Sequence, residues 1–196
     1  MNFLAHAYLS GDQTKIMIGN FIGDFVKGRE TLKKFDPMIA KGISLHRVID
    51  EFTDEHPVVT ESKKRLRPKY RHYAGVIVDV FYDHFLASEW HLYHRKSLHD
   101  YAHWVYQTIQ DAGEELPPGV KYMLPYMING DWLYSYRELA GIGRALSGMS
   151  RRTPYESRMD EAVADLEKDY ALFKEEFDQF FPQLMRHCEH WLHPRH

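Results

Sequence analysis

The stretch Y-R-H-Y-A-G-V-I-V-D-V-F-Y-D-H-F-L-A-S-E-W-H-L-Y, residues 70–93, is the most apolar segment of the chain. Its apolar side chains lie at Val76-Ile77-Val78, at Val80-Phe81 and at Phe85-Leu86. On a helix these positions cover much of the circumference, which is typical of a helix that is buried among other helices. The stretch therefore predicts a central helix around which the rest of the chain packs.

The segments on both sides of this stretch also have helical periodicity, and none alternates apolar and polar residues as a strand would. Asp12 precedes a periodic stretch that Gly28 ends, and Asp36-Pro37 is a helix start. The remaining helices are expected from Asp36 to His56, from Ser97 to the turn at 116–119, from Tyr136 to Leu146, and from Tyr155 onward along an apolar stripe to Leu184. We predict an all-α fold, a single compact multi-helix bundle that spans residues 1–196 as one domain.

The composition is that of an ordinary globular protein. The 196 residues include 25 Lys and Arg and 28 Asp and Glu, for a net charge of -3. The single cysteine, Cys188, excludes an intramolecular disulfide and a multi-thiolate metal site, and it favours a reducing compartment. No apolar run approaches the roughly 18 residues of a membrane span, and the N-terminus lacks the basic region of a secretory signal. We expect a cytoplasmic protein without membrane contact.

Several common catalytic signatures are absent from the sequence. It has no G-x-x-x-x-G-K-[ST] and no G-x-S-x-G, which excludes a P-loop and a hydrolase nucleophile elbow. It has neither H-E-x-x-H nor Glu-x-x-His, which excludes zincin proteases and the carboxylate-bridged di-iron bundles.

What remains is a set of His and Asp residues on the helices that are expected to be most buried. His46 and Asp50 are four residues apart, so their side chains share one helix face. Asp79 and Asp83 have the same spacing within the most apolar stretch, and His84 follows directly. Burying carboxylates there is unfavourable unless a cation or a hydrogen-bond donor pairs with them.

Asp24 and His6 extend this set, because both lie in otherwise apolar segments. Imidazole and carboxylate ligands without thiolates suit Mn²⁺, Fe²⁺, Co²⁺ or Zn²⁺, and such an ion activates water for hydrolysis. Each residue also has a purely structural interpretation. Asp50 could lie on a solvated helix surface, Asp79 could cap a helix or pair with an arginine, and His6 could be a hydrogen-bonded histidine of the core. The pattern favours a divalent metal site for hydrolysis.

A basic stretch at residues 62–72, S-K-K-R-L-R-P-K-Y-R-H, contains no acidic residue. In an acidic chain this indicates an anionic partner: nucleic acid, a phosphate-rich ligand or an acidic protein. Few aromatic residues interleave it, so nucleic acid is disfavoured. The predicted partner-binding residues are Lys63, Lys64, Arg65, Arg67, Lys69 and Arg71, with smaller basic sites at Lys27, Arg29, Arg151 and Arg152.

Five blocks closely resemble the acyl carrier protein phosphodiesterase family, also called acyl carrier protein hydrolyase. They are M-N-F-L-A-H (1–6), G-N-F-I-G-D-F-V-K-G-R (19–29), G-I-S-L-H-R-V-I-D-E-F-T-D (42–54), D-V-F-Y-D-H-F-L (79–86) and M-S-R-R (149–152). The resemblance implies a divergent branch of the HD phosphohydrolases and hence an HD-domain-like bundle. It also implies Mn²⁺-dependent removal of 4′-phosphopantetheine from a serine of holo-acyl carrier protein.

Guided by this resemblance, we expect Mn²⁺ to be held by His6, Asp24, His46 and Asp83. Asp50 would orient His46 or the attacking water. Arg47 would bind a non-bridging phosphate oxygen, and His84 would protonate the leaving alkoxide. The adjacent His-Asp pair of the HD superfamily is reversed here as Asp83-His84, and the literal pair at 99–100 lies outside the blocks.

Acyl carrier proteins are small, acidic and helical, so the resemblance also assigns a partner to the basic stretch. Two alternatives remain open. One is an HD-type phosphohydrolase of a nucleotide or other small phosphoester, and the other is a non-catalytic helical adaptor for acidic proteins.

Overall fold

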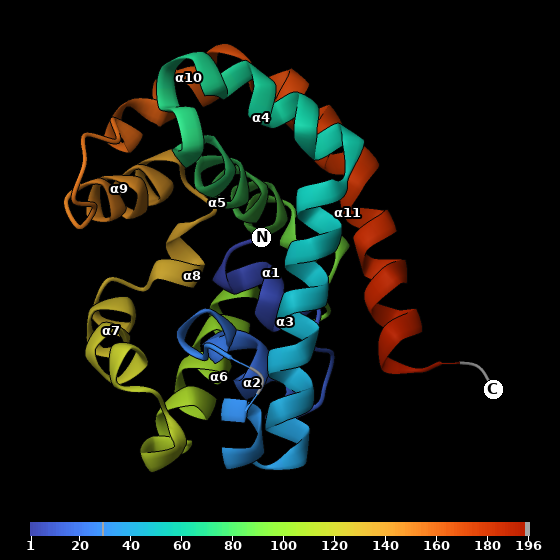
Figure 1. Ribbon diagram of the computed structural model, residues 1–196. Helices are drawn as coiled ribbons and strands as arrows, with labels where there is room; N and C mark the ends of the chain where they lie inside the picture. The colour runs from blue at the N-terminus through green and yellow to red at the C-terminus, as the bar shows by residue number, and fades with distance from the viewer. Residues whose placement is uncertain (29, 195–196) are drawn as a thin grey trace.

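The apolar stretch 70–93 forms helix α5 (Ala74–Ser88), which lies in the middle of the bundle in the computed structural model (Figure 1). The structure describes residues 1–28 and 30–194. Ile77, Val78 and Phe81 are fully buried, as expected of a central helix. The helix begins later than predicted because Arg71, with a φ of 52°, ends the preceding helix and redirects the chain.

Within the described residues the chain contains helices and no strand, which confirms the predicted all-α multi-helix bundle. The α-helices are α1 (Phe3–Tyr8), α2 (Thr14–Ile22), α3 (Pro37–Glu55), α4 (Pro57–Tyr70), α5 (Ala74–Ser88), α6 (Leu98–Asp111), α7 (Pro118–Asn129), α8 (Trp132–Ser135), α9 (Leu139–Ser150), α10 (Ala162–Lys168) and α11 (Tyr170–Leu192). Short 3₁₀ segments are η1 (Gly23–Phe25), η2 (Glu30–Lys34), η3 (Arg71–Tyr73), η4 (Trp90–Leu92), η5 (Gly113–Glu115) and η6 (Met159–Glu161).

Two helix starts are capped as the sequence predicts. The Asp36 carboxylate accepts a hydrogen bond from the Met38 N–H (2.8 Å) at the start of α3, and Ser97 Oγ accepts one from the Asp100 N–H (3.1 Å) at the start of α6. The predicted Asp12 cap is wrong, because α2 begins after Gln13 without a side-chain cap.

Several segments differ from the sequence prediction; α2, for example, ends at Ile22 and not at Gly28. Helices α4 and α7 are not predicted: each starts at a proline and contains a second one, Pro68 and Pro125, which weakens the local helix signal. The long C-terminal helix is also divided, because α10 ends at Lys168 and α11 begins at Tyr170. Its apolar stripe nevertheless faces the core in both parts.

The buried apolar side chains form one cluster that runs from Met1 to Leu192. Aromatic rings join α5 to α11 edge to face, with centroid distances of 5.2 Å for Phe81–Phe173 and 5.6 Å for Tyr82–Phe177. This packing fixes α5 against the C-terminal helix. In residues 1–28 and 30–194, every helix is too short or too polar to cross a membrane.

Candidate metal centre

The site depends on a very close crossing of α2 and α3. A Cβ at Gly19 would lie 2.0 Å from the Ile39 carbonyl oxygen, and a Cβ at Gly42 would lie 2.1 Å from the Ile16 carbonyl oxygen. Only glycine lets two helix backbones approach this closely at both positions. The crossing brings Asn20 of α2 within reach of His46 of α3.

His46 is held in one orientation by the backbone. Its Nδ1 lies 2.8 Å from the Asn20 carbonyl oxygen, an acceptor, so Nδ1 carries the proton. A Cβ at Gly23 would lie 2.2 Å from His46 Cγ, so the ring packs directly on the η1 backbone. Its Nε2 is therefore aimed at two carboxylates, 3.2 Å from Asp24 Oδ1 and 3.1 Å from Asp50 Oδ2.

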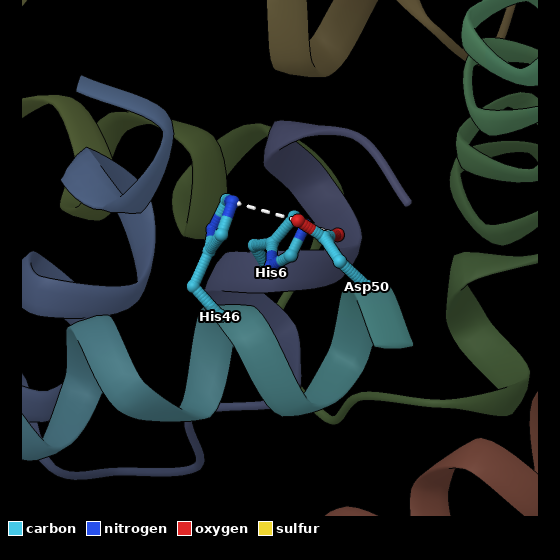
Figure 2. Close-up of side chains that lie close together, drawn as sticks. All are labelled: His6, His46 and Asp50. Carbon is cyan, nitrogen blue, oxygen red and sulfur yellow. Dashed lines mark ion pairs between the residues drawn. The ribbon is translucent and has the colours of Figure 1, made fainter. Parts of the chain in front are cut away.

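His6 reaches the same point from α1, and its ring stacks on that of His46 with centroids 4.0 Å apart (Figure 2). Asn20 Nδ2 donates to the His6 carbonyl oxygen (2.7 Å) and to Ser10 Oγ (2.9 Å), which fixes the orientation of the amide. Asn20 Oδ1 then accepts from His6 Nδ1 (2.8 Å). One buried asparagine thus sets the tautomer of both histidines and leaves each Nε2 directed at Asp50.

The environment of His6 Nε2 is what a cation requires. This nitrogen lies 3.3 Å from Asp50 Oδ1 and 3.2 Å from the Met1 carbonyl oxygen. Because Nδ1 holds the proton of the neutral ring, these three atoms are all acceptors, and the Met1 ammonium lies 3.9 Å from the same Asp50 oxygen. Burial, together with the nearby His46, lowers the pKa of His6 to about 4, so the ring is neutral. The donor set of the site fits a bound metal ion.

The carboxylates of Asp24 and Asp50 favour the protonated form of His46. Burial opposes ionisation of His46, but hydrogen bonds to Asp24 and Asp50 outweigh it and raise its pKa to about 9. Burial likewise opposes ionisation of Asp50, yet its pKa is held well below the usual range by the two histidines. The hydrogen bond from His46 also lowers the pKa of Asp24. The proton on His46 thus compensates one of the two negative charges.

Four of the predicted site residues therefore converge. The ligand atoms of His6, His46 and Asp50 all lie within 4.8 Å of one another, and Asp24 approaches His46 from the exposed side. Two imidazoles and a carboxylate on one face are compatible with a divalent metal ion. Asp50, expected to orient a neighbour, belongs to this group of ligand atoms itself.

Asp83 lies elsewhere. It is fully buried, and its two oxygens accept hydrogen bonds from the N–H groups of Leu4 (2.8 Å) and Ala5 (3.2 Å). The carboxylate thus serves as the cap of α1, whose own N-cap residue, Asn2, makes no side-chain cap bond. Burial raises the pKa of Asp83 to about 7 in spite of these two bonds. Through α1, this residue fixes the position of His6.

Arg47 and His84 also hold parts of the fold in place. Arg47 donates to the carbonyl oxygens of Val26 (3.2 Å) and Gly28 (3.3 Å), which fixes the segment that follows η1. His84 donates from Nδ1 to the Tyr136 carbonyl oxygen (2.8 Å), and its Nε2 lies 3.0 Å from the Tyr170 hydroxyl. Burial lowers the pKa of His84. Neither side chain is among those that line the cavity described next.

A cavity of about 600 Å³ opens beside the metal-binding cluster. Asp24 and Asp50 lie in its wall together with Asp79, whose Oδ1 is 3.0 Å from the Met1 amine, and Arg152. The rest of the lining is largely apolar and aromatic, including Phe25, Val76, Val80, Tyr122, Met123, Tyr126, Trp132 and Met149. With Asp54 the described part of the wall holds four carboxylates and one arginine, so its polar end would take an anionic group only together with a bound cation; the apolar remainder suits an elongated, mostly apolar body.

Sequence reasoning missed Asn20, Gly23 and the aromatic lining. Asn20 could have been found, because a fully buried amide in an apolar helix needs partners. Tyr122, Tyr126 and Trp132 of the lining come from α7 and α8, which have no distinctive sequence signal.

Comparison with known proteins assigns the family. The acyl carrier protein phosphodiesterase family model matches residues 1–184. The chain belongs to this family. It is similar to proteins named acyl carrier protein phosphodiesterase from Enterobacter sp. (33% identity, 94% of this chain and 96% of the relative) and from Photorhabdus laumondii (33%, 96% and 96%). A third, from Serratia proteamaculans, is 32% identical over 96% of this chain and 98% of its own.

All four converging residues lie within the part of the chain that matches the acyl carrier protein phosphodiesterase family. No solved structure matches the chain, so the HD-like arrangement stays a prediction.

The predicted basic partner surface on α4 is mostly neutralised within the protein. Arg65 forms a bidentate ion pair with Glu176, and Lys69 contacts Glu161 (3.2 Å) and Asp165 (2.9 Å). Lys63 and Lys64 pair with Asp54 and Glu61, each at 2.6 Å. Arg67, Arg71, Lys27 and Arg151 are exposed, Arg152 reaches the cavity, and Arg29 lies outside the described residues.

Proposed function

We propose that this protein is a metal-dependent phosphodiesterase that removes 4′-phosphopantetheine from the serine of holo-acyl carrier protein. The family assignment supports the reaction class. The observation that carries the proposal is the convergence of His6 Nε2, His46 Nε2 and Asp50, whose carboxylate lies in the wall of a cavity large enough for the phosphopantetheine arm. Cleavage yields the apo-carrier and free 4′-phosphopantetheine.

The metal-binding residues would be His6, His46 and Asp50, with Asp24 completing the set from the exposed side. A divalent ion, for which we propose Mn²⁺ because the ligands mix imidazole and carboxylate, supplies Lewis acidity and activates water at neutral pH. Asn20 binds the Nδ1 of both rings, so that each Nε2 is correctly aimed and would be the ligand atom, a task that outer hydrogen-bond partners of metal-bound histidines commonly perform.

Arg152 takes the role that the sequence suggests for Arg47. Among the described residues that line the cavity, it is the one basic side chain, so it is placed to bind a non-bridging oxygen of the phosphodiester. The apolar walls formed by Phe25, Met123 and Trp132 receive the pantetheine arm. We propose Asp83, Arg47 and His84 as positioning residues, because each fixes a segment that carries the site.

The decisive experiment is an incubation of the purified protein with holo-acyl carrier protein, in Mn²⁺ and in Mn²⁺ with excess chelator. Intact mass spectrometry of the carrier is the readout. We expect loss of the phosphopantetheine mass in Mn²⁺ alone. An unchanged carrier that still forms a complex would favour an adaptor over an enzyme, and hydrolysis of small phosphoesters without carrier cleavage would favour the other alternative.

A further inference from the structure

A second groove, of about 410 Å³, adjoins the cavity. The two share Tyr126, Trp132 and Arg152 as a common rim. The groove extends from this rim along α9, where its lining includes Arg144 and Arg151. In Figure 1, α7, α8 and α9 follow one another along one side of the molecule, whereas α4 crosses the top beside α11.

The groove follows from small residues on one face of α9. Gly141, Ala145 and Gly148 lie on this face at helical spacing. A Cβ at Gly141 would lie 1.8 Å from the Ser135 carbonyl oxygen, so α9 rests directly on α8. A Cβ at Gly148 would meet nothing within 4 Å, so the groove is open at that point. The sequence thus leaves a shallow channel whose edges are arginine side chains.

The charges of this groove differ from those of α4. Arg144, Arg151 and Arg152 are exposed, and within residues 1–28 and 30–194 none of them forms an ion pair. Among the residues that the structure describes, no carboxylate belongs to the lining of the groove. Four of the six basic side chains of the 62–72 stretch, in contrast, are matched by the protein's own carboxylates. Uncompensated positive charge beside a cavity attracts an anionic partner.

We propose that an acidic helix of the carrier protein binds in this groove, so that α9, and not α4, docks the substrate. The inference rests on the proposed function. A carrier whose serine-linked arm enters the cavity must cover the rim at Tyr126 and Trp132, and its adjoining surface then meets the arginines of α9. Tyr126, which is 59% exposed, supplies apolar contact to the same partner.

The test compares two double charge reversals by their affinity for apo-acyl carrier protein, measured by isothermal titration calorimetry at low salt. Arg144→Glu with Arg151→Glu alters the groove, and Lys64→Glu with Arg67→Glu alters α4. Both change the net charge equally, so the general attraction of an acidic partner is matched. We expect the α9 variant to bind at least about 10-fold more weakly and the α4 variant to bind within about 2-fold of the wild type.

Equal loss in the two variants, greater loss in the α4 variant, or no binding of apo-carrier by the wild-type protein would overturn the docking inference. Circular dichroism confirms folding, and Arg144→Gln with Arg151→Gln repeats the test should the reversal unfold the protein. Binding of apo-carrier involves no cleavage, so it separates the two proposals. Carrier that binds through α9 but is not cleaved in Mn²⁺ contradicts the proposed function alone, whereas cleavage with α9-independent binding contradicts the docking surface alone.

Discussion

Asp50 and Asp83 are two carboxylates of one bundle with opposite surroundings. Asp50, on α3, faces two imidazole nitrogens at the edge of a cavity, and its pKa is lowered. Asp83, on α5, is fully buried against two backbone N–H groups, and its pKa is raised to about 7. The sequence pattern around them is the same, because Asp50 follows His46 and Asp83 follows Asp79 at a spacing of four residues, one helical turn.

The difference shows that burial of a carboxylate does not by itself indicate a ligand. Asp83 oxygens are already satisfied by donors, so a metal ion would have to displace bonds that hold α1. Asp50 oxygens instead face the unprotonated Nε2 of His6 and the titrating His46. Four predictions test this comparison.

The largest effect is expected for Asp50→Asn. Removing the charge between the two histidines should reduce Mn²⁺-dependent cleavage of holo-carrier about 10³-fold or more, because the metal stabilises charge in the transition state by several kcal/mol. Metal content of the purified variant should fall in parallel, with helical circular dichroism unchanged. Glu51→Gln, one position along on the exposed face of α3, is the matched control. Activity within about tenfold of wild type would remove Asp50 from the metal site.

Asp83→Ala should act on stability. Two buried N–H groups lose their acceptors, which costs about 3 kcal/mol in the free energy of unfolding. For a chain of this length that lowers Tm by about 6–12 °C. The milder Asp83→Asn should fold and retain Mn²⁺ affinity within about tenfold, measured by calorimetry. A loss of metal binding as large as that of Asp50→Asn would show that Asp83 is a ligand after all.

The raised pKa of Asp83 predicts a pH dependence of stability. The folded protein binds this proton more tightly than the unfolded chain, whose aspartate has a pKa near its ordinary value of 3.8. The stabilising contribution is therefore present at low pH and is lost as pH rises through about 7. Relative to Asp83→Asn, the free energy of unfolding of the wild type should fall by about 2 kcal/mol from about pH 4.5 to about pH 6.5.

Urea unfolding of the two proteins at each pH measures this difference, because groups common to both cancel. A difference that is constant over the range, or one that grows with pH, would show that Asp83 is ionised in the folded state.

The smallest effect is expected for Gly23→Ala. The added methyl group would lie 2.2 Å from His46 Cγ, so the ring must move away from its backbone support. We expect a loss of about 1 kcal/mol in the free energy of unfolding and about tenfold weaker Mn²⁺ binding. Gly75→Ala, where the new Cβ meets only Lys63 Cε at 3.8 Å, is the control and should bind Mn²⁺ as the wild type does. Equal metal affinities in the two variants would contradict the support role of Gly23.

Much of the fold was predictable because the signals were local. The apolar stretch that became α5, the Asp36 cap of α3 and the Ser97 cap of α6 each depend on residues within a few positions of one another. Helices α4 and α7 escaped prediction because their internal prolines and weak periodicity hide a structure that tertiary contacts stabilise. For the same reason the aromatic lining that α7 and α8 give to the cavity could not be anticipated.

The sequence by itself determined the helical class and the family resemblance, and it indicated His6, Asp24, His46 and Asp50 as candidate site residues, because spacing along a helix and unusual polarity can be seen in the sequence. Only the tertiary structure decided which carboxylate oxygens accept hydrogen bonds from the protein and which basic side chains form ion pairs within it. Asp83 caps α1 because the backbone N–H of Leu4, 79 positions away in the chain, donates to it. Arg65 of α4 is unavailable to a partner because Glu176, 111 positions away, pairs with it. Hydrogen bonds and ion pairs form between atoms within about 4 Å in space, a distance that sequence separation does not encode.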